Sequence, residues 1–213
     1  MIFLRYESFN EYIRKYPVTS LFLLANIVML IVTVFSGGLG NHFTLIRLGA
    51  LYDFTIDNGR EDWWRYVASM FLHFDVPHFL FNNFALFVFA PPVERILGHF
   101  KYFLFYMGSG IIGNLISEGL QVVSNDSDAY VSAGASGAIY GIYGAFLFLI
   151  LFHRNLLDEA SRKTVQTILI IGVVYSVASP FVGGPTVNIS AHFGGLLGGF
   201  LIFGAFFQKT KLK

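Results

Sequence analysis

A serine and a histidine, far apart in the chain, are the two side chains best suited to chemistry in this sequence. Ser136 lies between glycines near the start of residues 130–152, a stretch without a charged residue. His192 is the only ionisable side chain in a second apolar stretch, residues 189–207. An adjacent base activates a serine hydroxyl as a nucleophile, and ionisable residues within membrane segments usually serve a function. The pair therefore predicts nucleophilic chemistry inside a membrane.

Glycines at helical spacing follow both residues, and they admit two interpretations. Small residues let membrane helices approach closely, which would bring an imidazole within hydrogen-bond distance of a hydroxyl, about 2.6–3.2 Å. For Ser136 taken alone, helix packing is the simpler interpretation; the pair taken together favours catalysis. The glycines are Gly137, Gly141 and Gly144 after the serine, and Gly194, Gly195, Gly198 and Gly199 after the histidine.

The composition predicts an all-α, polytopic membrane protein. Of its 213 residues, 55% are apolar and only 13% are charged, about half the charged fraction of soluble domains, which is about 25%. No cysteine is present, which excludes disulfides, thiolate metal sites and cysteine nucleophiles. We expect a single domain over residues 1–213 with six spans long enough to cross a bilayer. The expected spans are residues 18–35, 66–93, 102–123, 130–152, 165–182 and 189–207.

The distribution of basic residues predicts the orientation of these spans. Of the 14 lysines and arginines, only Arg47, Arg60 and Arg65 fall on one side, and the other 11 fall on the opposite side. The positive-inside rule then places both termini in the cytoplasm. The N-terminal part is a short segment of about residues 1–17, in which no cleavable signal peptide is expected. A long first loop, about residues 37–65, lies outside. The small size suggests a bacterial inner membrane.

The second expected span adds polar groups at a similar depth. Asp75 is a good N-cap and Pro77 is tolerated in a first helical turn, so a helix is expected to start there. His78 and Asn82 are four residues apart and share a helical face. Acyl transfer needs hydrogen-bond donors around the developing oxyanion, and this pair can supply them. The alternative is that these polar groups only bond one another between helices.

Taken together, these motifs resemble the rhomboid family of intramembrane serine proteases, over essentially the whole six-span core. The motifs are Gly134-Ala135-Ser136-Gly137, His192 before Gly195 and Gly199, His73 with His78 and Asn82, Trp64-Arg65 in the first loop, and Glu94-Arg95 after the second span. All five occur in the family's order.

The resemblance implies a role for each matching residue. Ser136 would be the nucleophile and His192 the general base and then acid, as a dyad without an acidic third member. The oxyanion hole would be formed by His78, Asn82 and the Ser136 amide. Of the other matching residues, His73 would support the site, Tyr140 would pack on His192, and Gly134 would leave room for the substrate. Trp64 and Arg65 would brace the first loop. Glu94 would connect the cytoplasmic ends of helices.

The same resemblance implies the partners, and two other functions stay open. Substrates would be single-pass transmembrane proteins that enter from the lipid bilayer; no cofactor, metal or nucleic acid is expected, and the oligomeric state is undetermined. A gate over the site is an open possibility. It would be formed by the fifth span, which contains Ser176, Ser179 and Pro180, or by the loop after that span, residues 183–185. One alternative is a non-catalytic rhomboid-like protein that binds membrane clients. A small transporter or channel is the other, although no inverted repeat is visible.

Overall fold

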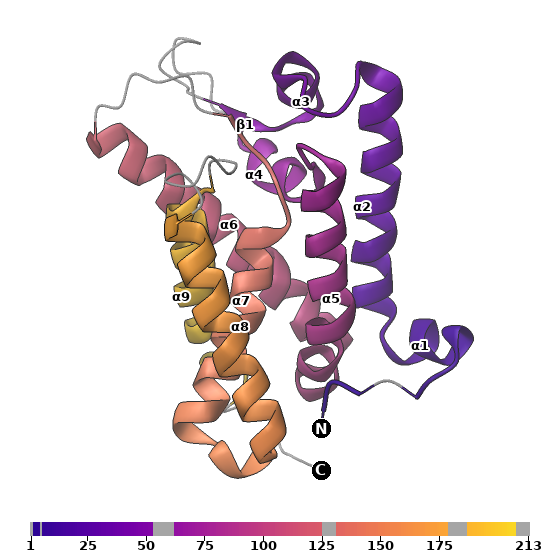
Figure 1. The fold of residues 1–213 in the computed structure, drawn as a ribbon, viewed down its shortest axis with the longest axis vertical. Coiled ribbons are helices and arrows are strands. Elements are labelled where there is room, and N and C mark those ends of the chain that lie inside the picture. The colour runs from indigo at the N-terminus through magenta and orange to yellow at the C-terminus, as the bar shows by residue number, and fades with distance from the viewer. Residues whose placement is uncertain (1, 5, 53–61, 125–130, 179–186, 208–213) are drawn as a thin grey trace.

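The computed structural model describes residues 2–4, 6–52, 62–124, 131–178 and 187–207, and these form a bundle of helices (Figure 1). Six helices have 17 residues or more, and shorter elements connect them. The long helices are α2 (Pro17–Ser36), α5 (Val76–Leu97), α6 (His99–Ser124), α7 (Ser136–Phe152), α8 (Glu159–Ala178) and α9 (Ile189–Phe207). The short elements are α1 (Phe9–Lys15), α3 (His42–Leu48), β1 (Leu51–Tyr52), α4 (Arg65–Ala68), η2 (Ser69–Phe71), β2 (Val131–Ser132) and η3 (Arg154–Leu156).

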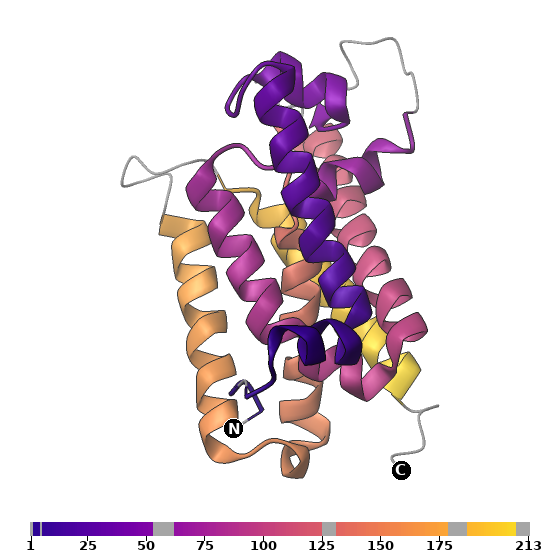
Figure 2. The same cartoon turned by 90° about the vertical axis from the view of Figure 1, so that its right-hand side faces the viewer.

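The long helices run roughly along one axis of the bundle. The α1–α2 junction, the α5–α6 turn and the α7–α8 connection lie at one end, whereas α3 and β1 lie at the other (Figures 1 and 2). Within the described residues, α2, α5 and α9 are long and apolar enough to cross a membrane, and α7 is apolar but shorter, with 17 residues. The fold is thus a polytopic helical bundle.

Three helices begin six or more residues away from the starts that hydropathy alone indicates. The second span starts at Val76 and not near residue 66, because the Asp75 carboxylate accepts a hydrogen bond of 2.6 Å from the His78 amide. The helix start expected from Asp75 and Pro77 is therefore confirmed. The fifth begins at Glu159 and not at residue 165, because Asp158 accepts bonds from the amide and hydroxyl of Ser161. The hydrogen bond from the Ser161 hydroxyl lowers the pKa of Asp158 most, and the bond from the Ser161 amide comes second. Together they bring this pKa to about 2.

The fourth span differs in another way. Helix α7 begins at Ser136, six residues after the expected start at residue 130, because Val131 and Ser132 are in an extended strand. That strand, β2, pairs antiparallel with β1 in the first loop, with Leu51 opposite Ser132. This two-residue pairing is the one departure from an all-α fold among the described segments, and it holds the first loop against the chain that enters α7.

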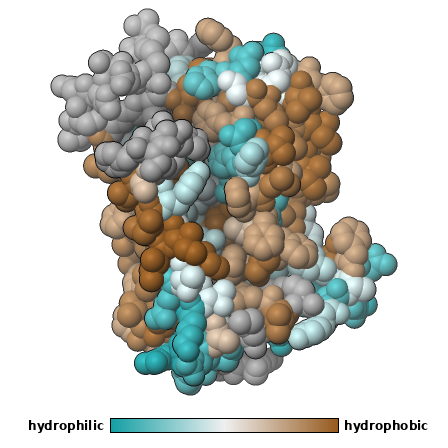
Figure 3. All heavy atoms as spheres, in the orientation of Figure 1, coloured by the Kyte–Doolittle hydropathy of each residue, from teal (hydrophilic) through white to brown (hydrophobic). Residues whose placement is uncertain are grey.

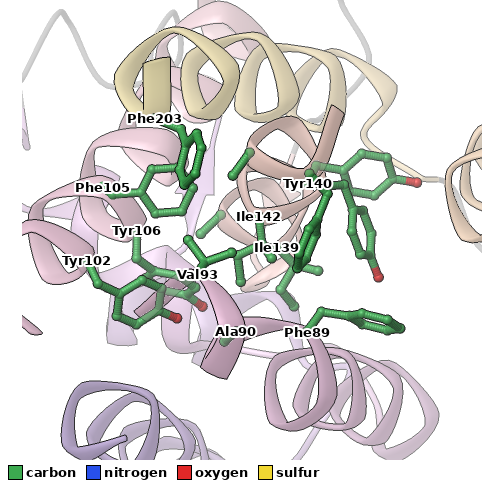
Figure 4. Packing of buried hydrophobic residues seen from close by; sticks show 14 of the residues in the cluster. Phe89, Ala90, Val93, Tyr102, Phe105, Tyr106, Ile139, Tyr140, Ile142 and Phe203 are labelled. Atoms are coloured by element: carbon green, nitrogen blue, oxygen red, sulfur yellow. The ribbon is translucent and has the colours of Figure 1, made fainter. Parts of the chain in front are cut away.

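The core lies between α5, α6, α7 and α9, where large side chains from all four helices meet (Figure 4). Tyr102, Tyr106 and Phe105 of α6 are fully buried, and Phe105 packs edge-on against Phe203 of α9. Between membrane helices such rings contribute through van der Waals packing and not through removal from water. The interior of the bundle is thus a packed aromatic core.

Helices α7 and α9 are in backbone contact through their glycines. A methyl group added at Gly195 would meet the carbonyl group of Gly137, and one at Gly199 would meet the carbonyl group of Gly141. Helix α6 joins this contact, because a methyl group at Gly113 would meet the Ala191 carbonyl oxygen. Glycine is required at these positions since any side chain would separate the helices.

The outer surfaces of α2 and of part of α8 are apolar. Hydrophobic residues dominate the visible surface over α2 and part of α8, and hydrophilic residues gather at the end with the α7–α8 connection (Figure 3). An apolar surface this extensive is expected where lipid chains are the solvent. Exposed residues of these two helices include Leu21, Leu24, Ile27, Ile31, Ile170, Ile171, Val173 and Val174.

Glu94 lies fully buried at the opposite end of α5 from Asp75 and joins three helices. Its carboxylate accepts hydrogen bonds from the amides of Val18 and Thr19 at the start of α2, at 3.0 and 2.9 Å. It also accepts the Thr19 hydroxyl and lies 2.8 Å from His99 Nδ1 of α6. A carboxylate suits this position because the first amides of a helix have no partner within the helix.

We predict that Glu94→Ala destabilises the protein. The first amides of α2 would lose their acceptor while buried, which costs about 1–3 kcal/mol for each unsatisfied group. Thermal unfolding of the purified protein measures the loss. The matched control is Glu159→Ala, because Glu159 forms only an exposed pair with Lys163, worth about 0.3–0.5 kcal/mol. An equal effect of both substitutions would show that the buried carboxylate is not special.

Candidate active site

The hydroxyl of Ser136 and the imidazole of His192 are hydrogen-bonded. Ser136 Oγ lies 2.8 Å from His192 Nε2, although 56 positions separate the residues in the chain. Both side chains are partly buried, and they lie in the first turn of α7 and of α9, two helices in glycine contact. This is the geometry in which an imidazole can accept the proton of a hydroxyl.

The position of His192 depends on Asn188, the residue directly before its helix. Asn188 Oδ1 accepts the Ala191 amide at 2.9 Å, as an N-cap does. The Asn188 amide group also donates to Ser117 Oγ of α6 at 2.8 Å and to Ser132 Oγ of β2 at 2.9 Å. One side chain therefore ties the start of α9 to α6 and to the strand that precedes Ser136.

Two side chains hold the imidazole from other directions. The Tyr140 ring, one turn after Ser136, stacks on the His192 ring with centroids 4.1 Å apart and planes 11° apart. Ser176 Oγ of α8 lies 3.0 Å from His192 Nδ1 and 3.2 Å from the Tyr140 hydroxyl. Both ring nitrogens and one face of the imidazole are thus in contact with protein groups.

His78 lies on the other side of Ser136, across Gly134. A methyl group at Gly134 would lie 2.9 Å from His78 Nε2 and 3.7 Å from Ser136 Oγ, so both side chains border the same space. Gly134 has φ of +139°, which favours glycine, and its amide donates to the Ser69 carbonyl oxygen at 2.9 Å. The glycine thus leaves room between the histidine and the serine.

Asn82 and His73 complete the polar groups on this part of α5. Asn82 is one turn after His78 and buried, and its Nδ2 has no hydrogen-bond partner among the described residues. His73 is buried before the helix, and its ring meets the His78 ring edge-on at 5.1 Å. The neighbouring Asn83 bonds the Asn26 side chain and the carbonyl of Phe79, so its amide serves helix packing.

The sequence is similar to a known protein family over most of its length. Residues 60–209 match the family profile of the rhomboid domain. YdcA, a protein of Bacillus subtilis (strain 168), is 36% identical over 212 residues that cover the whole of both chains.

Two further relatives are longer than this chain. The rhomboid protease GluP of the same organism is 34% identical over 85% of this chain and 33% of its own length. The rhomboid protease AarA of Providencia stuartii is 34% identical over 74% of this chain and 60% of its own. The chain thus spans all of YdcA and about a third of GluP.

The chain belongs to the rhomboid family. It is a serine-type intramembrane peptidase and a multi-pass membrane protein. The family assignment expected from the sequence is therefore confirmed, and the residues of its motifs can be located in the structure.

The tryptophan–arginine pair of this rhomboid lies under the first loop. The Arg65 guanidinium, half-enclosed by the Trp64 and Tyr52 rings at 4.7 and 4.8 Å, is almost fully buried. It donates to the carbonyl oxygens of Ile46 and Ala50, and it pairs with Asp62 at 2.9 Å. The arginine therefore connects the end of α3 and the residues after it to the start of α4.

Two residues at the rhomboid site have contacts that the sequence analysis did not assign. The sequence suggests a role for Ser176 only in a possible gate. An asparagine directly before an apolar helix is a recognisable N-cap signal, so the role of Asn188 can be recognised from the sequence. Nothing in the sequence around Ser176 indicates its partner. The proposed gate residues Ser179, Pro180 and 183–185 lie outside the described residues, as does part of the first loop, residues 53–61.

Proposed function

We propose that this rhomboid cleaves transmembrane segments of single-pass membrane proteins near the outer membrane interface, with Ser136 and His192 as its catalytic dyad. The observation that carries the proposal is the 2.8 Å hydrogen bond between Ser136 Oγ and His192 Nε2 at the start of two packed apolar helices. The family assignment supports the reaction class. The substrate class and the site of cleavage are the inference drawn here.

In the proposed reaction, Ser136 Oγ attacks a peptide carbonyl carbon as its proton passes to His192 Nε2. The electron pair of the carbonyl bond moves to oxygen, which gives a tetrahedral intermediate. The carbon–nitrogen bond then breaks as Nε2 returns the proton to the leaving amine. Water attacks the resulting ester by the same steps and releases the second product.

We assign the negative oxygen of the intermediate to a hole formed by His78, Asn82 and the Ser136 amide. The His78 ring and the Ser136 hydroxyl border the same space at Gly134. Asn82 Nδ2 is buried on the same face of α5, and no described residue bonds it. Amides in the first turn of a helix such as α7 have no intrahelical acceptor and carry the positive end of the helix dipole. These donors suit an oxyanion.

The membrane arrangement that we propose has six spans, α2, α5, α6, α7, α8 and α9, with both termini in the cytoplasm. The α1–α2 junction, the α5–α6 turn and the α7–α8 connection share one end of the bundle (Figures 1 and 2). Among the basic residues that the structure describes, all but Arg47 and Arg65 lie in the elements at that end, as expected for a cytoplasmic side. Ser136, His192 and His78 lie in the first turns of their helices, at the other end of the bundle. The proposed orientation puts that end close to the outer interface.

A helical substrate would have to unwind locally at this site. Its scissile carbonyl would otherwise be bonded within its own helix and shielded by side chains. Glycine and proline lower the cost of unwinding, by about 1 and 3 kcal/mol relative to alanine. Substrates with such residues near the outer interface are therefore expected to be preferred.

The proposal is tested by reconstituting the full chain with a labelled single-pass substrate. Wild-type protein is expected to release two fragments whose ends, read by mass spectrometry, lie near the outer interface. His192→Ala should release neither. Equal cleavage by His192→Ala would exclude the proposed function, and binding without cleavage by the wild type would instead favour a non-catalytic retention protein.

We predict that Asn82→Ala lowers kcat about 10²- to 10³-fold, the usual effect of removing one oxyanion donor. The Michaelis constant should change little, because the oxyanion exists only after attack. Cleavage kinetics with a single-pass substrate check this.

Asn83→Ala is the matched control for this substitution, since the neighbouring amide bonds Asn26 and a backbone carbonyl and lies outside the site. A similar fall in kcat in both variants would refute the assignment of Asn82.

A further inference from the structure

Ser176 of α8 contacts both the catalytic imidazole of His192 and Tyr140, whose ring stacks on that imidazole. Its Oγ lies 3.0 Å from His192 Nδ1 and 3.2 Å from the Tyr140 hydroxyl. Its side chain is almost fully buried, with 3% exposed. The contact is between chain segments, since 16 residues separate Ser176 from His192 and 36 separate it from Tyr140.

Helix α8 offers little else to the site. Its described buried residues are Ser161, Val165 and Ser176, and the neighbours of Ser176, Tyr175 and Val177, are about half exposed. One turn before Ser176, a methyl group at Gly172 would lie 2.6 Å from the Tyr140 hydroxyl oxygen. The narrow face made by Gly172 and Ser176 therefore fits closely against Tyr140 and His192.

A serine hydroxyl in a membrane helix ordinarily bonds a carbonyl of its own helix. Ser109 of α6, which donates to the Phe105 carbonyl oxygen, and Thr164 of α8, which donates to the Ala160 carbonyl oxygen, do so here. Ser176 instead lies within hydrogen-bond distance of two side chains on other helices. Its partners, and not its burial alone, distinguish it from those two hydroxyls.

We propose that Ser176 is the hydrogen-bond acceptor for the Nδ1–H of His192 and is a positioning residue for the reaction; this rests on the dyad proposed above. If Ser136 donates its proton to Nε2, the neutral imidazole must carry its own proton on Nδ1. Nδ1–H then requires an acceptor, and Ser176 Oγ lies at the correct distance. The hydroxyl of Ser176 has its own proton left for the Tyr140 oxygen.

The same bond matters more during the reaction than before it. When His192 takes the proton of Ser136, both ring nitrogens carry protons and the ring is positive. A hydrogen bond from a charged donor is roughly twice as strong as a neutral one. Ser176 therefore stabilises the imidazolium more than the neutral ring, and its loss is expected to lower kcat rather than substrate binding.

The test uses the full chain in detergent with a single-pass substrate. Ser176→Ala is expected to lower kcat about 10- to 100-fold, the value of one hydrogen bond to a charged group, with an unchanged Michaelis constant. Ser176→Thr, which keeps the hydroxyl, should restore most of the activity. The rate at which a fluorophosphonate labels Ser136 should fall in parallel, because labelling requires the activated hydroxyl and no substrate binding.

Thr164→Ala is the control, since it removes a hydroxyl from the same helix that, within the described segments, bonds its own backbone and no other residue. Should Ser176→Ala fail to fold, Ser176→Cys replaces it, because a thiol is of similar size and a weak acceptor; the same loss of kcat is expected. In wild type, ¹⁵N nuclear magnetic resonance, assigned by comparison with His192→Ala, should find the proton of neutral His192 on Nδ1.

Three outcomes would overturn the inference. These are a kcat of Ser176→Ala equal to that of Thr164→Ala, a loss confined to the Michaelis constant, or a neutral His192 with its proton on Nε2. Failure of the dyad itself would look different, because Ser136→Ala would then retain activity. A fully active Ser176→Ala beside an inactive Ser136→Ala would reject the role of Ser176 alone.

Discussion

Ser136→Ala is expected to abolish peptide cleavage while leaving the bundle folded. The substitution removes one oxygen atom that lies 2.8 Å from His192 Nε2, and no other described hydroxyl lies at that nitrogen. In serine hydrolases with an equivalent pair, loss of the nucleophile lowers kcat on the order of 10⁶-fold. Product formation from a single-pass substrate should therefore fall below detection, and fluorophosphonate labelling should disappear.

The control for this prediction is Ser109→Ala. Ser109 is a fully buried serine in α6 whose hydroxyl donates to the carbonyl of Phe105 in its own helix, at 2.7 Å. Activity and labelling should persist in that variant. Continued cleavage by Ser136→Ala would show that the nucleophile is another group and would remove the basis of the dyad.

Gly195→Ala is expected to impair both activity and stability, although it adds a single methyl group. That methyl would lie against the Gly137 backbone, 2.7 Å from its carbonyl carbon and 3.1 Å from its Cα. Backbone atoms in two packed helices cannot turn away as a side chain can, so α7 and α9 must move apart. Overpacking of this kind costs about 1–3 kcal/mol.

The consequence for activity follows from the position of Gly195. It lies three residues after His192, and its contact, Gly137, directly follows Ser136. Separation of the helices at this point lengthens the hydrogen bond of the dyad. Misplacement of a catalytic group by about 1 Å can lower the rate about 10²-fold, and kcat with a single-pass substrate should fall by that order.

Gly119→Ala is the matched control for Gly195→Ala. Gly119 is an exposed glycine inside α6, and a methyl group there would meet no atom within 4 Å. Thermal unfolding and cleavage should stay at wild-type values, or stability should rise slightly, since alanine favours a helix more than glycine. Equal losses in both variants would show that the glycine contact does not hold the dyad together.

Much of the site was predictable because its signals are local. The apolar stretches predicted a helical membrane protein, and the order of the motifs around Ser136, His192 and His78 indicated the family. Asp75 and Pro77 indicated where a helix starts, because an N-cap acts on amides two or three residues away. Signals of this kind depend on neighbours in the chain and can be read from it.

The start of the fourth span and the support of the dyad depend on contacts between distant segments. Hydropathy alone places the start of the fourth span six residues too early, since it measures apolarity and not where the chain changes from strand to helix. The pairing of Leu51 with Ser132 and the contact of Ser176 with His192 join segments from different parts of the chain. Each contact depends on how a helix or strand is rotated and how deep it lies within the bundle. The close packing of glycines and aromatic rings sets that rotation and depth in three dimensions. The periodicity of a single segment does not encode them.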